Sequence, residues 1–137
     1  MKDELISSVR NFVKALDSCN FEEARLYLSP RCRYRIDQTE IVGPEPILRS
    51  YAENDKWAKD TLERVVYESR VERISAKTFD VLYIDRIFHK GLEHDYQSHE
   101  LLVLDDMGEI EQIFHEDIAG EPEALKEFFK ACKIQRT

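Results

Sequence analysis

The chain has 137 residues, of which 42% are hydrophobic, and this is enough for one domain with a hydrophobic core. We therefore expect residues 1–137 to form a single globular domain. Its formal net charge is −8, from 20 basic and 28 acidic residues. Such a balance opposes binding to nucleic acid or to an anionic membrane surface, and we expect neither as a partner.

The cysteines are odd in number and widely spaced, at Cys19, Cys32 and Cys132. This pattern predicts free thiols in a reducing compartment and not a zinc site or a disulfide framework. The first ten residues carry charges where a signal peptide needs an apolar run, and no stretch is long and apolar enough to span a membrane. We expect a cytoplasmic protein that needs no metal or other cofactor.

The first half of the chain predicts three helices and two strands. Apolar residues recur at helical spacing from Leu5 to Leu16, and a capping box at Asn20 starts a second helix that we expect to end at Ser29-Pro30. Alternation over residues 31–37 predicts a half-buried strand, and residues 39–42 predict a short return strand. Gly43-Pro44 then opens a third helix.

The second half predicts four long antiparallel strands, at residues 62–74, 78–88, 92–104 and 108–118. Lys90-Gly91 suits a two-residue hairpin turn, and Pro122 begins a last helix. The facing of the strand at 78–88 stays open, because the alternating set that contains Tyr83 and Asp85 competes with the set that contains Ile84 and Phe88.

Helices precede the sheet and do not alternate with its strands, so the order predicts an α+β fold. We expect a curved antiparallel β-sheet wrapped around the N-terminal helices, with a C-terminal helix. This cone-shaped α+β barrel would leave a pocket between sheet and helices.

Three stretches carry a resemblance to a known family: ALDSCNFEEARLYLSPRCRYR, IVGPEPILRSY and LLVLDDMGEIEQIFHED. In their order and spacing the chain resembles the nuclear transport factor 2-like superfamily, which includes ketosteroid isomerases and SnoaL-like polyketide cyclases. The resemblance implies a cone-shaped pocket for a small apolar or aromatic organic molecule. It does not imply one reaction, because this fold hosts many unrelated activities.

The ketosteroid isomerases give a residue comparison. Their first-helix tyrosine corresponds to Phe12 here, so that hydroxyl is missing. Their general base falls near Ile36 or Asp37, and their protonated aspartate of the penultimate strand matches Glu100. The resemblance therefore implies Asp37 and Glu100 as candidate catalytic carboxylates, while Phe12 disfavours a steroid isomerase. For Asp37 the alternative is a plain turn residue.

A tight turn at Asp105 to Gly108 would place Glu100 directly opposite His115 on the closing hairpin. A carboxylate beside an imidazole fixes its tautomer and raises its basicity, which is how a general base is built. Asp117 lies two residues further on the same face and is a candidate second acid. The alternatives are a satisfied structural pair, or a one-residue slip that turns both side chains outward.

Aromatic and apolar side chains are the candidate substrate-binding residues, since tyrosine hydroxyls in an apolar cavity can position a ligand oxygen. They are Tyr34, Trp57, Tyr67, Tyr96, Leu102 and Ile113. The alternative for the aromatic residues is core packing. We expect no metal site, because His94 and His99 are five residues apart on one strand and point to opposite faces.

The outer face of the sheet should carry four apolar residues, Leu101, Val103, Ile110 and Phe114. An apolar outer face needs cover, which predicts a homodimer that pairs sheet to sheet. The last helix could cover this face instead.

The first functional hypothesis is a small-molecule-binding protein that carries out acid/base isomerisation, dehydration or cyclisation. Glu100 and His115 would be base and orienting group, with Asp37 or Asp117 as a second acid. The alternative is a non-catalytic module, either a ligand carrier or a dimeric interaction domain.

Overall fold

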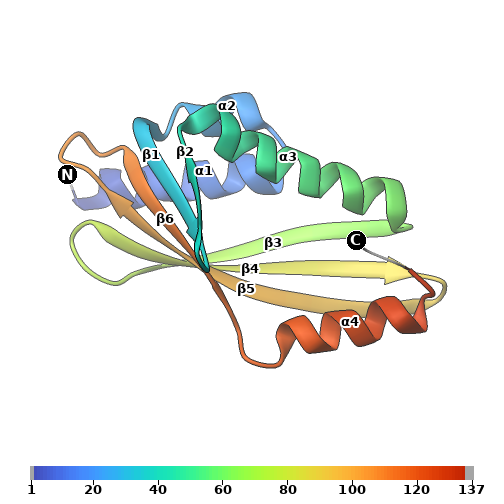
Figure 1. Ribbon diagram of the computed structural model, residues 1–137. Helices are drawn as coiled ribbons and strands as arrows, with labels where there is room; N and C mark the ends of the chain where they lie inside the picture. The colour runs from blue at the N-terminus through green and yellow to red at the C-terminus, as the bar shows by residue number, and fades with distance from the viewer. Residues whose placement is uncertain (1, 135–137) are drawn as a thin grey trace.

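The computed structural model describes residues 2–134 and has an α+β architecture with one six-stranded sheet (Figure 1). The elements in chain order are α1 (Lys2–Asp17), α2 (Phe21–Arg25), β1 (Leu28–Ile36), β2 (Thr39–Val42), α3 (Pro44–Thr61), β3 (Arg64–Arg73), β4 (Thr78–His89), β5 (Leu92–Leu104), β6 (Ile110–Asp117) and α4 (Glu121–Ala131). The strand order is β2-β1-β6-β5-β4-β3.

The sheet is mixed and open. The four long strands β3 to β6 form the predicted antiparallel meander. The expectation of a wholly antiparallel sheet is corrected at one place, because β1 runs parallel to β6. The edge strands β2 and β3 do not meet, so the sheet curves around the helices without closing into a barrel.

The second helix is shorter than predicted. The side chain of Asn20 accepts a hydrogen bond from a backbone N–H and caps α2, as expected, but the helix ends at Arg25. The chain enters β1 at Leu28, so Pro30 lies inside a strand. The pairing of β1 with β6 is irregular around this proline, which has no N–H to donate to the ladder.

Two turns set the register of the long strands. Lys90 and Gly91 both have positive φ, 50° and 76°, and join β4 to β5 in the predicted two-residue hairpin. At the β5–β6 turn, the carboxylate of Asp105 accepts hydrogen bonds from the N–H groups of Met107 and Glu109, each at 2.9 Å. Side-chain and backbone geometry therefore hold both hairpins in one pairing.

Helices α1 and α3 pack on one face of the sheet, which we call the inner face. Buried side chains of this face and of the two helices form one core cluster. Its members with 0% exposure include Val9 and Phe12 of α1, Ile47 of α3, and Phe79, Val81, Leu102 and Ile113 of the sheet. Burial of apolar surface stabilises a fold by about 25 cal/mol per Å², so this cluster contributes strongly to stability. The inner face also includes Tyr83 and Asp85, which settles the facing of β4.

The last helix also packs on the inner face. Phe128 and Phe129 of α4 form a second cluster with Leu62 and Ile87, and Phe129 meets Trp57 of α3 edge to face at a centroid distance of 5.5 Å. Because Ile87 shares its face with Asp85, α4 does not cover the outer face. In Figure 1, α4 runs beside β5 near the end where β4 turns into β5.

The outer face keeps three of its four predicted apolar residues. Leu101, Val103 and Phe114 are half-buried and belong to neither core cluster. Ile110 is a correction, since it is 1% exposed and lies in the first cluster. The reason is an irregularity in the pairing of β5 with β6 next to Val103, which turns Ile110 inward.

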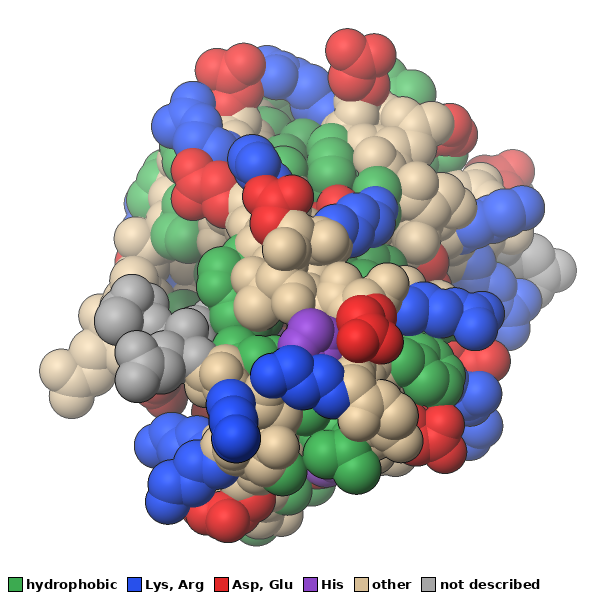
Figure 2. All heavy atoms as spheres, turned by 90° about the vertical axis from the view of Figure 1, so that its right-hand side faces the viewer, with side chains coloured by type: hydrophobic (Ala, Val, Ile, Leu, Met, Phe, Trp, Pro, Cys, Tyr) green, Lys and Arg blue, Asp and Glu red, His purple; other side chains and the backbone are tan. Residues whose placement is uncertain are grey.

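Figure 2 views the end of the molecule at which β4 turns into β5, and here acidic, basic and apolar side chains are interspersed. No helix within residues 2–134 combines the length and apolar character needed to cross a membrane.

Candidate active site

A pocket of about 620 Å³ lies between the inner face of the sheet and the helices. Pockets that hold small organic molecules have volumes of about 300–1,000 Å³. The four predicted aromatic residues, Tyr34, Trp57, Tyr67 and Tyr96, all line it. The pocket is therefore large enough for a ligand and is not filled by its own aromatic side chains.

Leu102 and Ile113 do not line this pocket, which corrects their prediction as substrate-binding residues. They face each other across β5 and β6, and both are 0% exposed. Helices α1 and α3 cover this end of the inner face, so the two side chains belong to the core. They lie on the same face of the sheet as Glu100 and His115 but do not line the pocket.

The predicted pairing of the closing hairpin is confirmed. Glu100 lies opposite His115, and Ser98 lies opposite Asp117. All four side chains line the pocket. The regular pairing through this stretch rules out the one-residue slip that would have turned them outward.

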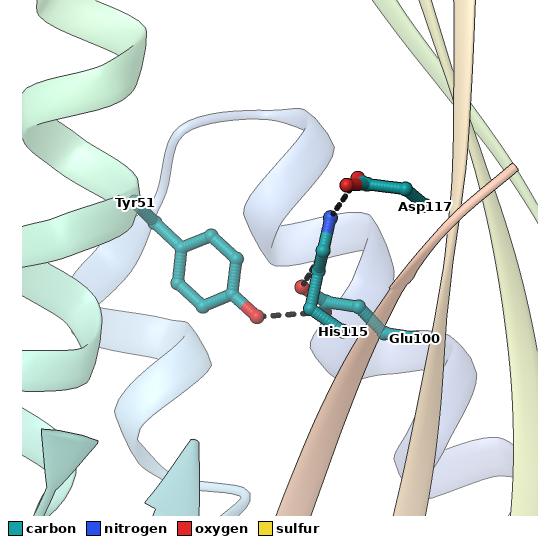
Figure 3. A network of polar contacts seen from close by, with 4 residues as sticks. All are labelled: Tyr51, Glu100, His115 and Asp117. Atoms are coloured by element: carbon teal, nitrogen blue, oxygen red, sulfur yellow. Dashed lines mark hydrogen bonds and ion pairs between the residues drawn. The ribbon is translucent and has the colours of Figure 1, made fainter. Parts of the chain in front are cut away.

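Four side chains form a continuous chain of polar contacts, which we call the relay (Figure 3). The hydroxyl of Tyr51, on α3, donates a hydrogen bond to Oε1 of Glu100 at 2.7 Å. Glu100 Oε2 lies 3.5 Å from Nδ1 of His115, and His115 Nε2 lies 3.1 Å from Oδ1 of Asp117. Both ring nitrogens therefore face a carboxylate.

The relay runs from the protein interior to the open pocket. The side-chain exposure rises from 4% at Glu100 through 15% at His115 to 45% at Asp117. A proton on the Asp117 side of the ring is thus the one nearest to solvent and ligand, while the Glu100 side is sealed.

The relay favours the charged form of the imidazole. The contact with Glu100 raises the pKa of His115, burial opposes this rise, and Asp117 adds to it. A ring with a carboxylate at each nitrogen is best satisfied when both nitrogens carry a proton. The arrangement therefore stabilises an imidazolium.

Tyr34 completes this end of the pocket. Its ring meets the ring of Tyr51 edge to face at 5.8 Å and lies 6.4 Å from the ring of His115. Burial and the nearby charge of Glu100 hold the pKa of Tyr34 well above its usual range, so its hydroxyl stays protonated and can donate a hydrogen bond.

Asp37 lies apart from the other candidates. It occupies the turn between β1 and β2 with a φ of 51°, is exposed, and does not line the pocket. Aspartate tolerates this left-handed conformation better than most residues. The geometry matches the turn-residue alternative.

A second polar region of the pocket, which we call the acidic corner, combines the predicted Tyr67 and Tyr96 with three residues that were not predicted to line the pocket: Asp17, Tyr83 and Asp85. Asp85 pairs across the sheet with Tyr67 on β3 and with Tyr96 on β5. Burial, followed by the charges of Asp17 and Glu100, raises its pKa to about 7. Both alternating sets of β4 contain large apolar residues, so periodicity could not show which way Asp85 points.

Tyr51 was also missed as a functional residue. Its partner Glu100 lies 49 residues further along the chain. No local pattern reports such a contact, because it depends on how α3 is rotated against the sheet.

His94 and His99 are not part of the relay. His94 stacks on Phe128 at a centroid distance of 5.5 Å, and His99 pairs with Asp80 at 3.1 Å on the outer face. Throughout the described part of the chain, no group of three or more potential ligands is arranged to hold a metal ion.

No family model matches the sequence, and no curated protein is similar to it. Solved structures do match. The LEH-like epoxide hydrolase from M. tuberculosis is 18% identical, with a TM-score of 0.66 over 94% of each chain. The chain has the nuclear transport factor 2-like fold.

Two further structures with this fold are similar over nearly the whole chain. A putative polyketide cyclase from Xanthomonas campestris pv. campestris is 10% identical, with a TM-score of 0.64, 94% of this chain covered and 96% of the other. A nuclear transport factor 2-like protein of unknown function from Cytophaga hutchinsonii is 19% identical, with a TM-score of 0.57 and coverages of 92% and 95%. At these identities the likeness concerns the fold alone.

Proposed function

We propose that this protein binds a small organic molecule with an apolar or aromatic body and transfers protons on it by acid/base chemistry. The observation that carries the proposal is the relay, in which His115 is held between Glu100 and Asp117 at the wall of a 620 Å³ pocket. Buried titratable groups with shifted pKa values cluster at functional sites.

In the proposed step, His115 is the general acid. Its Nε2 proton leaves the contact with Asp117 and passes to an oxygen of the bound molecule. Asp117, released from the ring and partly exposed, then accepts a proton from a carbon of the ligand or from water. Glu100 and Tyr51 orient the ring through Nδ1 and do not touch the ligand.

This assignment differs from the simplest interpretation of the hairpin, in which the imidazole is a base. A free base needs a ring nitrogen without a proton, whereas here each nitrogen faces a carboxylate and the pKa of His115 is raised. Isomerisation, dehydration and cyclisation each combine protonation of an oxygen with loss of another proton. The similarity to an epoxide hydrolase and a putative polyketide cyclase supports a reaction on a small organic molecule.

The test starts from ligands found by thermal-shift screening of wild-type protein. Each ligand is incubated with the protein in deuterated water, and turnover or deuterium incorporation at its carbons is followed by NMR. We expect His115→Gln to slow either process by about a hundredfold or more, the usual contribution of a general acid.

His99→Gln is the matched control, because His99 also contacts a carboxylate at 3.1 Å but lies on the outer face. It should retain wild-type rates. Equal rates in wild type and His115→Gln, for a ligand shown to bind, would remove the catalytic role.

A non-catalytic ligand carrier is the second candidate. It is favoured by one observation: both nitrogens of His115 and both oxygens of Glu100 already have partners. A saturated network can serve only to hold the pocket open and polar. Under this alternative, ligands bind tightly and emerge unchanged, without deuterium.

We further propose that two copies pair through the outer face of the sheet. Leu101 and Phe114 are cross-strand neighbours there, and neither belongs to a core cluster of the described residues. Wild-type protein should sediment as a dimer and Leu101→Lys/Phe114→Lys as a monomer. Met107→Lys, at an exposed apolar residue of the β5–β6 turn, is the control. A monomeric wild type at high concentration would refute the pairing.

The cytoplasm remains the proposed location. Cys19, Cys32 and Cys132 all carry free thiols, and burial raises the pKa of Cys32 to about 12. Free thiols fit a reducing compartment.

A further inference from the structure

The acidic corner holds negative charge that the protein does not neutralise. Carboxylates line the pocket on five elements, while no lysine or arginine lies among its described lining residues: the carboxylates are Asp17, Glu53, Asp55, Asp85, Glu100 and Asp117. Three of the six face a basic side chain. Glu100 and Asp117 face His115, and Asp55 pairs with Lys59 at 3.1 Å from outside the pocket.

Asp85 and Asp17 are the half-buried carboxylates left without a cation among the described residues. Asp17 accepts one hydrogen bond, from the hydroxyl of Ser69 at 2.5 Å. Within residues 2–134, no side chain donates a hydrogen bond to Asp85 and no cation pairs with it. The two groups lie close enough for the charge of Asp17 to raise the pKa of Asp85. Two like charges in one enclosed corner are costly unless a positive charge joins them.

Tyr83 is an independent sign that a ligand belongs in this corner. Its side chain lines the pocket, and its hydroxyl is buried near Glu100 but makes no hydrogen bond of normal geometry among the described residues. Buried hydroxyls are nearly always hydrogen-bonded in native proteins, and leaving one unpaired costs about 1–3 kcal/mol. The backbone of β4 places Tyr83 two residues from Asp85, on the same face.

The shape of the corner suits an ammonium group in particular. Asp85 lies between Tyr67 and Tyr96 at directly opposed positions of the neighbouring strands, where Cβ atoms are about 4.5–5.5 Å apart. Aromatic rings around a carboxylate attract organic cations through their π faces. Asp17 is the last residue of α1, whose C-terminal carbonyl groups add partial negative charge.

We propose that the acidic corner binds the ammonium group of the ligand, so that the molecule held in the pocket is an amine with an apolar or aromatic body. The ammonium lies between Asp17 and Asp85, donates hydrogen bonds to both, and leaves one contact for the Tyr83 oxygen. This inference rests on the proposed function, in which the pocket takes a small organic molecule, and adds the chemical class of that molecule.

The test compares three probes of similar size and different charge: phenethylamine, phenethyl alcohol and phenylacetate. Trp57 is the single tryptophan of the chain and lines the pocket, so its fluorescence reports binding at the site. Titrations at about pH 8 keep the amine charged and Asp85 largely ionised. We expect phenethylamine to bind about tenfold or more tighter than phenethyl alcohol, and phenylacetate to bind weakest.

Two variants locate the preference. Asp85→Asn should reduce the amine preference to about twofold or less, because it removes the charge and keeps the shape. Asp80→Asn is the matched control, since it makes the same change on the same strand but on the outer face, and it should keep the preference. Thermal unfolding of both variants verifies that they are folded.

Three results would overturn the inference: equal binding of amine and alcohol, an amine preference that survives Asp85→Asn, or no binding of phenethylamine at millimolar concentration. Equal and measurable binding of amine and alcohol to wild-type protein would leave the small-molecule pocket intact while excluding an ammonium site. The acid role of His115 is tested separately by His115→Gln, so failure of one proposal is distinguishable from failure of the other.

Discussion

Glu100 and Asp85 face the same pocket from neighbouring strands and are held in opposite ways. Glu100 is 3% exposed, yet a tyrosine hydroxyl and an imidazole occupy its two oxygens. Asp85 is paired across the sheet with two tyrosines and has no counter-charge in the described part of the chain, and its pKa rises to about 7. Burial alone therefore does not decide what an ionised carboxylate costs. Hydrogen-bond and ion-pair partners offset that cost, and the pKa of Asp85 is raised where such partners are missing.

The difference assigns separate tasks to the two regions. A partnered carboxylate can orient another group, as Glu100 orients His115. An unpartnered carboxylate in a cavity destabilises the free protein and regains that free energy when a cation arrives. The relay is thus suited to chemistry and the acidic corner to recognition.

The largest expected effect concerns the cost of the unpartnered carboxylate. Asp85→Asn should raise the free energy of unfolding at about pH 8 by up to about 4 kcal/mol, the equivalent of moving a carboxyl pKa from 3.8 to about 7. Because the folded pKa lies above the ordinary value, wild-type stability should fall as pH rises from about 4 to about 7. Chemical denaturation across this range measures both.

The variant should lose this part of the pH dependence. If the stability of Asp85→Asn and of wild type changes with pH in parallel, ionisation of Asp85 does not destabilise the folded protein. Asp80→Asn makes the same change on the outer face, where the carboxylate has a partner in His99, and it should keep the fall of stability that is due to Asp85.

The next effect compares two tyrosines of the pocket. Tyr51→Phe removes a hydrogen bond to the Glu100 carboxylate and should lower the free energy of unfolding by about 1.5–3 kcal/mol. Tyr83→Phe removes a buried hydroxyl that has no partner, and stability should be unchanged or raised. A larger loss of unfolding free energy for Tyr83→Phe than for Tyr51→Phe would show that the Tyr83 hydroxyl, and not the Tyr51 hydroxyl, has the stronger partner.

Much of this fold was predictable, because local patterns determine it. The bounds of β5 at Leu92 and Leu104, the turn at Lys90-Gly91 and the facing pair Glu100 and His115 all follow from alternation and turn chemistry. The parallel pairing of β1 with β6 was not predictable in this way, since it joins strands separated by most of the chain.

The site was predictable only in its strands. Tyr51 reaches Glu100 through the rotation of α3, and Asp85 points inward on a strand whose two faces are both rich in apolar residues. Leu102 and Ile113 share the correct face but lie where α1 and α3 close against the sheet. An inward-facing residue lines the pocket or joins the core according to its position along the strand. Alternation shows which face a residue is on but not this position.

A smaller effect concerns the two carboxylates of the relay. Glu100→Gln and Asp117→Asn should both lower the pKa of His115, and Glu100→Gln should lower it more, because the contact with Glu100 is the main cause of the rise. NMR titration of the ring protons measures the order. An equal or larger decrease in Asp117→Asn would show that the exposed carboxylate governs the ring. Asp85→Asn is the control, because its carboxyl makes no contact with His115.

The same raised pKa has a consequence for stability. His115 contributes stability that is fully present below its unfolded pKa of about 6.5 and is lost as pH rises through its folded value. His115→Gln should therefore differ from wild type most at mildly acidic pH. A difference that grows above neutrality would have the wrong sign for an imidazolium held by carboxylates.

The most direct measurement is the protonation state of His115 in the wild-type protein, followed by the ¹⁵N chemical shifts of its ring against pH. We expect both nitrogens to carry protons below the transition and the pKa to lie above about 6.5, the ordinary value for histidine. A pKa at or below that value, with one nitrogen unprotonated at mildly acidic pH, would contradict the claim that His115 is held between Glu100 and Asp117 as a proton donor.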